Sequence, residues 1–292
     1  MGLIGRFAAS VGFRHPADSF STRHVSALAP VVLGGCGRSG TTLLRMILDS
    51  HPAICCGPES NVFRRSTLDP GELALKFDLD PGQVREVHES AGSRPAFIEA
   101  FAALCMERAG KRRWAEKTPR NIRRLDVIFR HFPQARFIHV LRDGRDVACS
   151  LRTHPRHKVV NGELVPLDTW KPIAGCARRW RNDIERSRPY WTDPRFQTLR
   201  YEGLVREPRP VLERLMAFVG EGWDDRLLEH TDTGSPFRNV TTFAQNPEAL
   251  EPVNTRAVSR WERDLDAKDR RIFKRIAGKL LIELGYADDD DW

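Results

Sequence analysis

Short apolar segments alternate along this chain with longer segments of helical periodicity. The apolar segments are rich enough in Val, Ile, Leu and Phe to form buried parallel strands. We expect strands near residues 31–35, 53–56, 112–116, 135–141 and 196–201. Strands that alternate with helices predict an α/β fold, in which a central parallel sheet is flanked by helices.

The helices are predicted from capping residues and from the spacing of apolar positions. Thr118 and Pro119 are a suitable N-cap and first residue for a helix that ends near His131. We also expect short capped helices within 61–110 and further helices near 144–151, 168–188, 208–219, 224–230, 256–264 and 267–283. The loops 154–168 and 231–254 are long enough to be lids over a functional site.

Length and charge narrow the class of protein. A chain of 292 residues suits one large domain, which we place at 30–286, between an N-terminal extension (1–29) and an acidic tail (287–292). The net charge of +8, from 47 basic and 39 acidic residues, favours anionic ligands. No helix-turn-helix signature or interleaved aromatic pattern accompanies that charge, so nucleic acid is not expected as a partner.

The apolar runs and the cysteines indicate the cellular compartment in which the protein is expected. No apolar run is long enough to span a bilayer, and the first residues lack a signal-peptide core. The six cysteines do not have the spacing of metal ligands. We therefore expect a reduced, cytoplasmic protein with no membrane span and no metal. The sequence carries no signal for an oligomeric state.

A glycine-rich turn follows the first predicted strand. Residues 31–42 read Val-Val-Leu-Gly-Gly-Cys-Gly-Arg-Ser-Gly-Thr-Thr, so successive backbone N–H groups can converge on an anion at the start of a helix. Gly35 and Gly40 have the spacing of a P-loop, but Thr41 stands where a P-loop NTPase has its lysine. That lysine serves the terminal phosphates of a triphosphate. The expected fold is thus a P-loop-like domain whose site, with Arg38, suits a terminal group of lower charge, such as sulfuryl.

A second segment predicts another phosphate contact. Residues 136–150 read Arg-Phe-Ile-His-Val-Leu-Arg-Asp-Gly-Arg-Asp-Val-Ala-Cys-Ser. Arg142 ends a buried strand at the edge where open α/β sheets bind ligands, and Ser150 lies on the helix that follows. No acidic residue ends this strand as a Walker-B aspartate would, which argues against an ATPase or kinase.

Together these motifs resemble the sulfotransferases that use 3′-phosphoadenosine-5′-phosphosulfate (PAPS). Arg38-Ser-Gly-Thr-Thr-Leu is similar to the family's 5′-phosphosulfate loop, and residues 136–150 are similar to its 3′-phosphate motif. Cys56-Gly-Pro-Glu-Ser and Trp114-Ala-Glu-Lys-Thr-Pro resemble the tyrosylprotein sulfotransferase branch. The resemblance runs in order from about residue 31 to 286. We expect a soluble, bacterial-type member of that branch.

The resemblance implies a role for each matching residue. Glu59 is expected to be the general base, Lys117 to donate to the leaving oxygen, and Arg38 to stabilise the sulfuryl oxygens. The residues expected to bind PAPS are Gly37, Arg38, Ser39, Gly40, Thr41, Thr42, Arg142, Ser150, Tyr201 and Arg260. The reaction would be an in-line transfer of the sulfuryl group to a hydroxyl, which leaves adenosine 3′,5′-bisphosphate (PAP) as product and needs no metal.

Departures from the tyrosylprotein pattern leave the acceptor open. Two arginines of that branch that hold acidic peptide residues fall on Asn61 and Arg65, and the disulfide partner of Cys56 falls on Glu116. The acceptor is therefore a small molecule, a saccharide or a peptide tyrosine, an acidic acceptor included. His51 is the alternative base, although His-Pro after a helix is more typical of a C-terminal stop.

Two other classes of protein serve as alternatives. A P-loop-type kinase or NTPase would need a phosphate-binding lysine and a magnesium-binding aspartate, and neither stands at the required position. A non-catalytic PAPS- or PAP-binding module would keep both phosphate motifs but would not need Glu59 or Lys117. The presence of both residues favours an enzyme.

Overall fold

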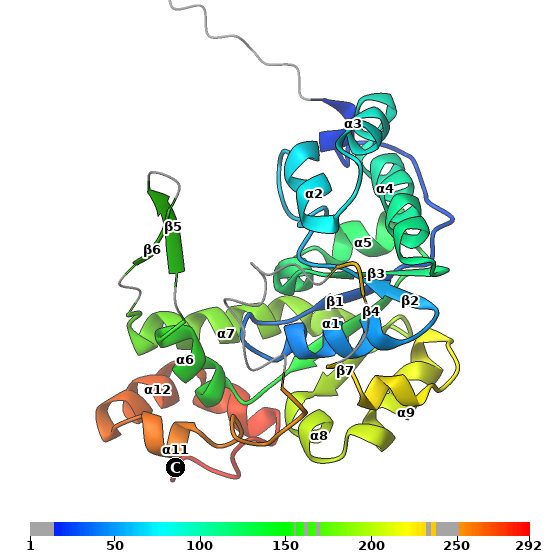
Figure 1. Ribbon diagram of the computed structural model, residues 1–292. Helices are drawn as coiled ribbons and strands as arrows, with labels where there is room; N and C mark the ends of the chain where they lie inside the picture. Colours follow the sequence, from blue (N-terminus) through cyan, green and yellow to red (C-terminus); the bar gives the residue numbers. More distant parts are fainter. Residues whose placement is uncertain (1–14, 155, 161–162, 168–169, 232–234, 238–250) are drawn as a thin grey trace, which may run out of the picture.

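A computed structural model of the chain describes residues 15–154, 156–160, 163–167, 170–231, 235–237 and 251–292. At its centre lies a parallel sheet of five strands (Figure 1). The strands are β1 (Val31–Gly34), β2 (Ile54–Cys56), β3 (Arg113–Lys117), β4 (Arg136–Leu141) and β7 (Phe196–Arg200). Their order is β2-β3-β1-β4-β7, and every neighbouring pair is parallel. The predicted fold class and all five predicted strands are confirmed.

Helices connect the strands. The α-helices are α1 (Thr41–Ser50), α2 (Pro70–Phe77), α3 (Pro81–Ser90), α4 (Arg94–Ala109), α5 (Leu125–His131), α6 (Gly144–Arg152), α7 (Ile173–Ser187), α8 (Tyr201–Arg206), α9 (Pro208–Val219), α11 (Trp261–Asp264) and α12 (Ala267–Glu283). The 3₁₀ helices are η1 (Pro16–Asp18), η2 (Pro119–Arg123), η3 (Arg188–Tyr190) and η4 (Asp225–Leu228). A separate antiparallel hairpin pairs β5 (Arg156–Val160) with β6 (Glu163–Leu167).

Both faces of the central sheet are buried, as expected for parallel strands that helices enclose. Val32 and Phe137 belong to one apolar cluster with Phe101 of α4 and residues of α5. Val31 belongs to a second cluster on the other face, with Leu44 of α1 and residues of α9 (Figure 1). A third cluster joins α6, α7, α11 and α12. The loops at the carboxyl ends of the strands therefore rest on a rigid base.

Three predicted helices differ from the structure. The helix expected from Thr118 to His131 is divided at Arg124, whose φ of −128° and ψ of 18° are not helical. The buried Asn121 side chain donates to the Leu33 carbonyl and holds η2 against the sheet. The helix expected over 256–264 is regular only in α11, and the one expected over 224–230 is the short η4.

The start of α11 has a clear physical cause. Ser259 has a φ of 56°, in the left-handed region, so a helix cannot run through it. The buried carboxylate of Asp146 accepts hydrogen bonds from the backbone N–H groups of Ser259 and Trp261. Such bonds satisfy the first amide groups of α11, as an N-cap does. The cap comes from a helix more than a hundred residues earlier, so local sequence does not reveal it.

The other differences concern one helix and two predicted loops. Within 61–110 the third helix, α4, has 16 residues and is not short. The predicted loop 154–168 contains the β5–β6 hairpin. Most of the predicted lid at 231–254 lies outside the described residues.

Both described ends of the chain contact the rest of the molecule. Asp18 forms an ion pair of 3.0 Å with the fully buried guanidinium of Arg94 in α4. Trp292 packs edge-on against Trp261, with the ring centroids 5.7 Å apart.

The domain limits at residues 29 and 286 stay predictions. Over the described ranges, none of the helices combines the length and the apolar character that crossing a bilayer requires.

Candidate active site

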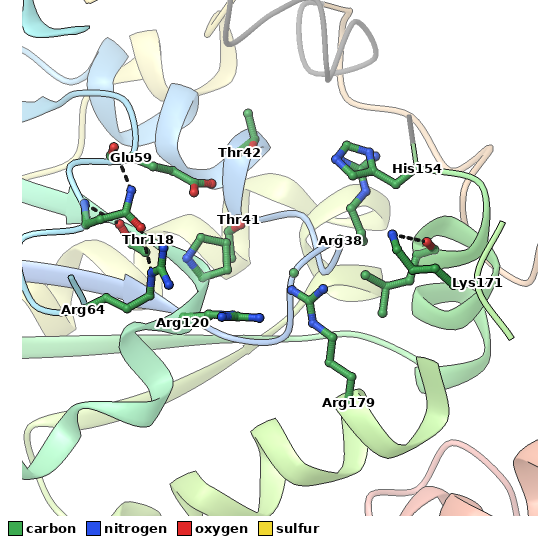
Figure 2. A pocket seen from close by; sticks show the side chains of 14 residues that line it. Arg38, Thr41, Thr42, Glu59, Arg64, Thr118, Arg120, His154, Lys171 and Arg179 are labelled. Carbon is green, nitrogen blue, oxygen red and sulfur yellow. Dashed lines mark hydrogen bonds between the residues drawn. The ribbon is translucent and has the colours of Figure 1, made fainter. Parts of the chain in front are cut away.

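A cavity of about 300 Å³ lies where β1, β2 and β3 end and α1 begins (Figure 2). Its walls include Gly37, Arg38, Thr41 and Thr42 of the glycine-rich turn. Glu59 comes from the loop after β2. The cavity occupies the edge of the sheet at which open α/β folds bind ligands.

The glycine-rich turn leaves the start of α1 open to an anion. Gly40 is the N-cap of α1 and provides no side-chain hydrogen bond. Its φ is 93°, and a Cβ at this position would lie 2.4 Å from the ring of Tyr201, so glycine is required here. The Oγ atom of Ser39 is buried and has no hydrogen-bond partner in the described structure. The unsatisfied hydroxyl and the uncapped amide groups suit a phosphate or sulfate.

Side chains of the second predicted phosphate motif, residues 136–150, contact the glycine-rich turn. Arg38 Nε donates to Ser150 Oγ at 3.0 Å, and Arg142 Nη1 donates to the backbone carbonyl of Arg38 at 3.0 Å. Arg142 also donates to the Ala257 carbonyl, and its guanidinium stacks over the Tyr201 ring at 4.5 Å. The structure thus brings together four of the positions predicted to bind PAPS: Arg38, Arg142, Ser150 and Tyr201.

Two of the three predicted catalytic side chains form an ion pair. Lys117, at the end of β3, places its Nζ 2.9 Å from Glu59 Oε1. The side chain of Lys117 is 1% exposed, whereas that of Glu59 is 43% exposed and lines the cavity. Burial by itself raises the pKa of Glu59, but the charge and hydrogen bond of Lys117, together with Lys76 and Arg64, lower it below its ordinary value. Glu59 is therefore ionised at neutral pH and able to accept a proton.

A buried carboxylate holds this pair in place. Glu116 Oε1 accepts from Ser60 Oγ and from Thr118 Oγ1, both at 2.7 Å, and Glu116 Oε2 accepts from the amide of Asn121. Burial raises the pKa of Glu116, and these donors partly offset that effect. The bonds tie the loop that carries Glu59 to the strand that carries Lys117. In the sequence, Glu116 stands out only because it replaces a cysteine of the tyrosylprotein pattern, and nothing local reveals this role.

Several other predicted positions lie away from the cavity. His51 caps the far end of the ten-residue α1, roughly 15 Å from its start, and its Nε2 contacts the Gly222 carbonyl at 3.0 Å. Arg260 Nη2 is paired with Asp264 at 2.6 Å. Arg65 is paired with Glu72. Neither arginine lines the cavity.

Four basic side chains that were not predicted from the sequence also line the cavity. They are Arg64, Arg120, Lys171 and Arg179. Arg179 Nη2 lies 2.7 Å from where a Cβ on Gly37 would stand, so glycine at position 37 leaves room for this guanidinium. No motif marks these residues, because each belongs to a different element. Among the described residues, no group of three or more His, Cys, Asp or Glu side chains could hold a metal ion.

Comparisons with known proteins fit this geometry. A model of the sulfotransferase family matches residues 30–225. The protein-tyrosine sulfotransferase of Drosophila melanogaster is 27% identical over 269 residues, which cover 88% of this chain and 51% of that protein. Protein-tyrosine sulfotransferase 1 of Danio rerio is 28% identical over 269 residues, which cover 88% of this chain and 72% of that protein. The chain thus spans about half the length of the Drosophila protein.

Solved structures share the fold. The sulfotransferase domain of the Synechococcus olefin synthase has a TM-score of 0.66 and 21% identity, and the match covers 89% of this chain and 96% of that domain. A mouse sulfotransferase in complex with PAP has a TM-score of 0.57 and 14% identity, with 93% and 92% of the two chains covered.

Proposed function

This chain belongs to the sulfotransferase family, and we propose that its cavity binds PAPS and transfers the sulfuryl group to an acceptor hydroxyl. The observation that carries the proposal is the Glu59–Lys117 pair at 2.9 Å, whose Glu59 lines the same cavity as Arg38 and the uncapped start of α1. A base and an anion site thus share one cavity, and the lysine that pairs with the base is buried directly behind it. The mouse relative that was solved with PAP supports the nucleotide assignment.

The described residues fit PAPS in particular. The orphaned Ser39 Oγ and the amide groups of α1 suit the 5′-phosphosulfate. Arg142, whose Nε has no hydrogen-bond partner in the described structure, and Ser150 suit the 3′-phosphate. Thr41 in place of a P-loop lysine disfavours a triphosphate. Together these groups support a nucleotide with a separate 3′-phosphate as the ligand.

The side chains divide the work of an in-line transfer. Glu59 accepts the acceptor's proton as the acceptor oxygen bonds to sulfur. Lys117 donates a hydrogen bond to the bridging oxygen as its bond to sulfur breaks, and this stabilises the departing PAP. Arg38 offsets the negative charge on the sulfuryl oxygens. The fold holds all three groups in position before the reaction starts, so little reorganisation is needed.

Localisation and branch also belong to this proposal. We place the protein in the cytoplasm because all six of its cysteines are free and buried, as a reducing compartment favours. Cys56 faces no cysteine partner in the described structure. Membership of a soluble, bacterial-type branch rests on the sequence pattern alone. Cell fractionation with an antibody to this chain would test the compartment.

The variant Glu59→Gln tests the catalytic assignment. It keeps the shape and hydrogen-bonding capacity of the side chain but removes proton acceptance. We expect the rate of sulfuryl transfer to fall roughly 10²–10⁴-fold, with PAP affinity almost unchanged. The measurement incubates the protein with PAPS and a panel of phenols, saccharides and acidic peptides, and follows sulfated products by mass spectrometry.

Two controls make this result specific. Glu72→Gln alters a nearby carboxylate that pairs with Arg65 and does not line the cavity, so it should leave the rate nearly unchanged. A phenol acidic enough to be ionised at the assay pH needs no base and should lose much less rate in Glu59→Gln. Loss of PAP binding together with rate would contradict the assignment of Glu59 as base.

A further inference from the structure

Three arginines on one side of the cavity are assigned no contact with the reacting groups above, although the charge of Arg64 helps to lower the pKa of Glu59. Arg64 comes from the loop after β2, Arg120 from η2 and Arg179 from α7. In Figure 2 their guanidinium groups extend along the side of the cavity opposite Thr42. We call them the arginine row. Each of three separate elements thus contributes one planar guanidinium to the same cavity.

The charges of the arginine row are poorly compensated by the protein. Arg120 forms no hydrogen bond or ion pair within the described part of the chain. Arg179 Nε lies 3.9 Å from Asp183, a carboxylate that Arg123 already engages. Arg64 Nε donates to Asn61 Oδ1 at 3.0 Å, but that amide is neutral.

The remaining carboxylate of the cavity does not change this balance. Glu59 is the carboxylate that the described lining provides, and Lys117 already pairs with it. Burial first, and then the like charges of Arg179, Arg123 and Arg64, lower the pKa of Arg120. The arginine row therefore repels itself, and a bound anion would relieve that repulsion.

The sulfuryl donor does not account for this anion. In the proposed function, Arg38, Lys117 and the start of α1 serve the phosphosulfate, and Arg142 with Ser150 serve the 3′-phosphate. None of the three arginines belongs to either set, although Arg179 lies beside Gly37 of the glycine-rich turn. Its excess charge is on the side of the cavity that remains for the acceptor.

We propose that the arginine row binds a phosphate-type dianion that the acceptor carries close to the hydroxyl it offers to Glu59. The planar fork of a guanidinium pairs two N–H groups with two oxygens of a phosphate or sulfate ester. Three such forks around one cavity suit one compact dianion better than a single carboxylate. This inference rests on the proposed function, because it assigns the remaining part of the same site.

Calorimetry with phenyl phosphate tests the proposal on the full chain. The protein is first saturated with PAP, so the nucleotide's own phosphate sites are filled. Phenyl phosphate is then titrated at a pH of about 7.5, where its second proton, with a pKa of about 6, is lost. Phenol and benzoate serve as the neutral and singly charged analogues. We expect phenyl phosphate to bind at least tenfold more tightly than either.

The variants separate the arginine row from general charge. Arg120→Gln and Arg179→Gln should each weaken phenyl phosphate about tenfold or more, as the loss of a charge-assisted hydrogen bond predicts. Arg178→Gln is the matched control, since Arg178 is the exposed neighbour on α7 and does not line the cavity. This control variant should change the affinity for phenyl phosphate by less than about threefold. Arg120 is itself exposed, so its variant is expected to fold.

Each outcome decides a separate question. If PAP itself does not bind, the proposed function fails. If PAP binds but phenyl phosphate binds no better than phenol, the arginine row is not a dianion site, although the sulfotransferase assignment stands. Equal binding by the wild type, Arg120→Gln and Arg179→Gln would place the phosphate elsewhere in the cavity and would also overturn this inference.

Discussion

The carboxylate of Glu59 and the ammonium of Lys117 face each other from unlike surroundings. Glu59 is in reach of solvent and substrate, whereas Lys117 is almost fully buried. The lysine offsets the rise in pKa that burial alone would cause in Glu59. One residue therefore controls the protonation state of the other, which couples the proposed base to the proposed proton donor.

This coupling predicts a change in pH dependence for Lys117→Met, a variant that keeps the aliphatic stem of the side chain. Without the ammonium, burial is opposed less and the pKa of Glu59 rises. Since the base must be deprotonated, the acid limb of the profile of kcat/KM against pH should move to higher pH. The pH at which the acid limb lies can be measured even though the variant transfers sulfuryl more slowly.

Lys76→Met is the control for this shift. Its Nζ pairs with Glu72 at 2.6 Å and also donates to the backbone carbonyl of Glu59 at 3.4 Å. Its charge has a smaller effect on the pKa of Glu59 than that of Lys117. The limb should therefore move less than in Lys117→Met. A profile that stays in place in both variants would show that another group is the base.

Strand β3 and the loop after β2 are connected by the buried Glu116. Ser60, Thr118 and Asn121 all donate to its carboxylate, and Asn121 also donates to Leu33 at the end of β1. The ends of three strands are thus tied around one side chain. This arrangement keeps the base and the lysine in register without a disulfide.

Glu116→Ala should therefore cost stability as well as activity. The substitution leaves three buried donors without their acceptor, at about 1–3 kcal/mol for each unsatisfied group. We expect the free energy of unfolding to fall by roughly 3 kcal/mol or more, as measured by urea denaturation. Glu107→Ala, on the exposed face of α4, should change it by less than about 0.5 kcal/mol. A similar small change in Glu116→Ala would mean that the three donors find other partners.

The donor site is built from parts that are far apart in the chain. The turn before α1, the end of β4, α6, Tyr201 and the carbonyl of Ala257 meet through Arg38 and Arg142. A ligand that bridges these parts binds the folded chain and not the unfolded one. Nucleotide binding should therefore stabilise the molecule as a whole.

Thermal unfolding tests this property. At a PAP concentration of 100 times Kd, the stabilisation is about 2.7 kcal/mol, which corresponds to a rise in Tm of roughly 5 °C or more. At the same concentration of PAP, Arg142→Ala should show a much smaller rise, because Arg142 joins the first motif to Ala257 and to Tyr201. ATP should raise Tm less than PAP does, and an equal rise with ATP would contradict the donor assignment.

The sequence by itself determined the sheet, the glycine-rich turn and the positions of the three residues expected to be catalytic. These features are local: an apolar run specifies a buried strand, and glycine spacing specifies the turn that begins at its end. Lys117 ends one such strand and Arg38 and Glu59 lie within a few residues of the ends of two others, so the parallel topology alone places them at one edge of the sheet.

Only the tertiary structure decided which other side chains share that edge. It turned Arg65 toward Glu72 and brought Arg64, Arg120 and Arg179 to the cavity, from three elements that no motif connects. It also paired Arg260 with Asp264 and kept His51 at the far end of α1. Charge interactions depend on distance in space, and helix packing sets that distance for residues far apart in the chain.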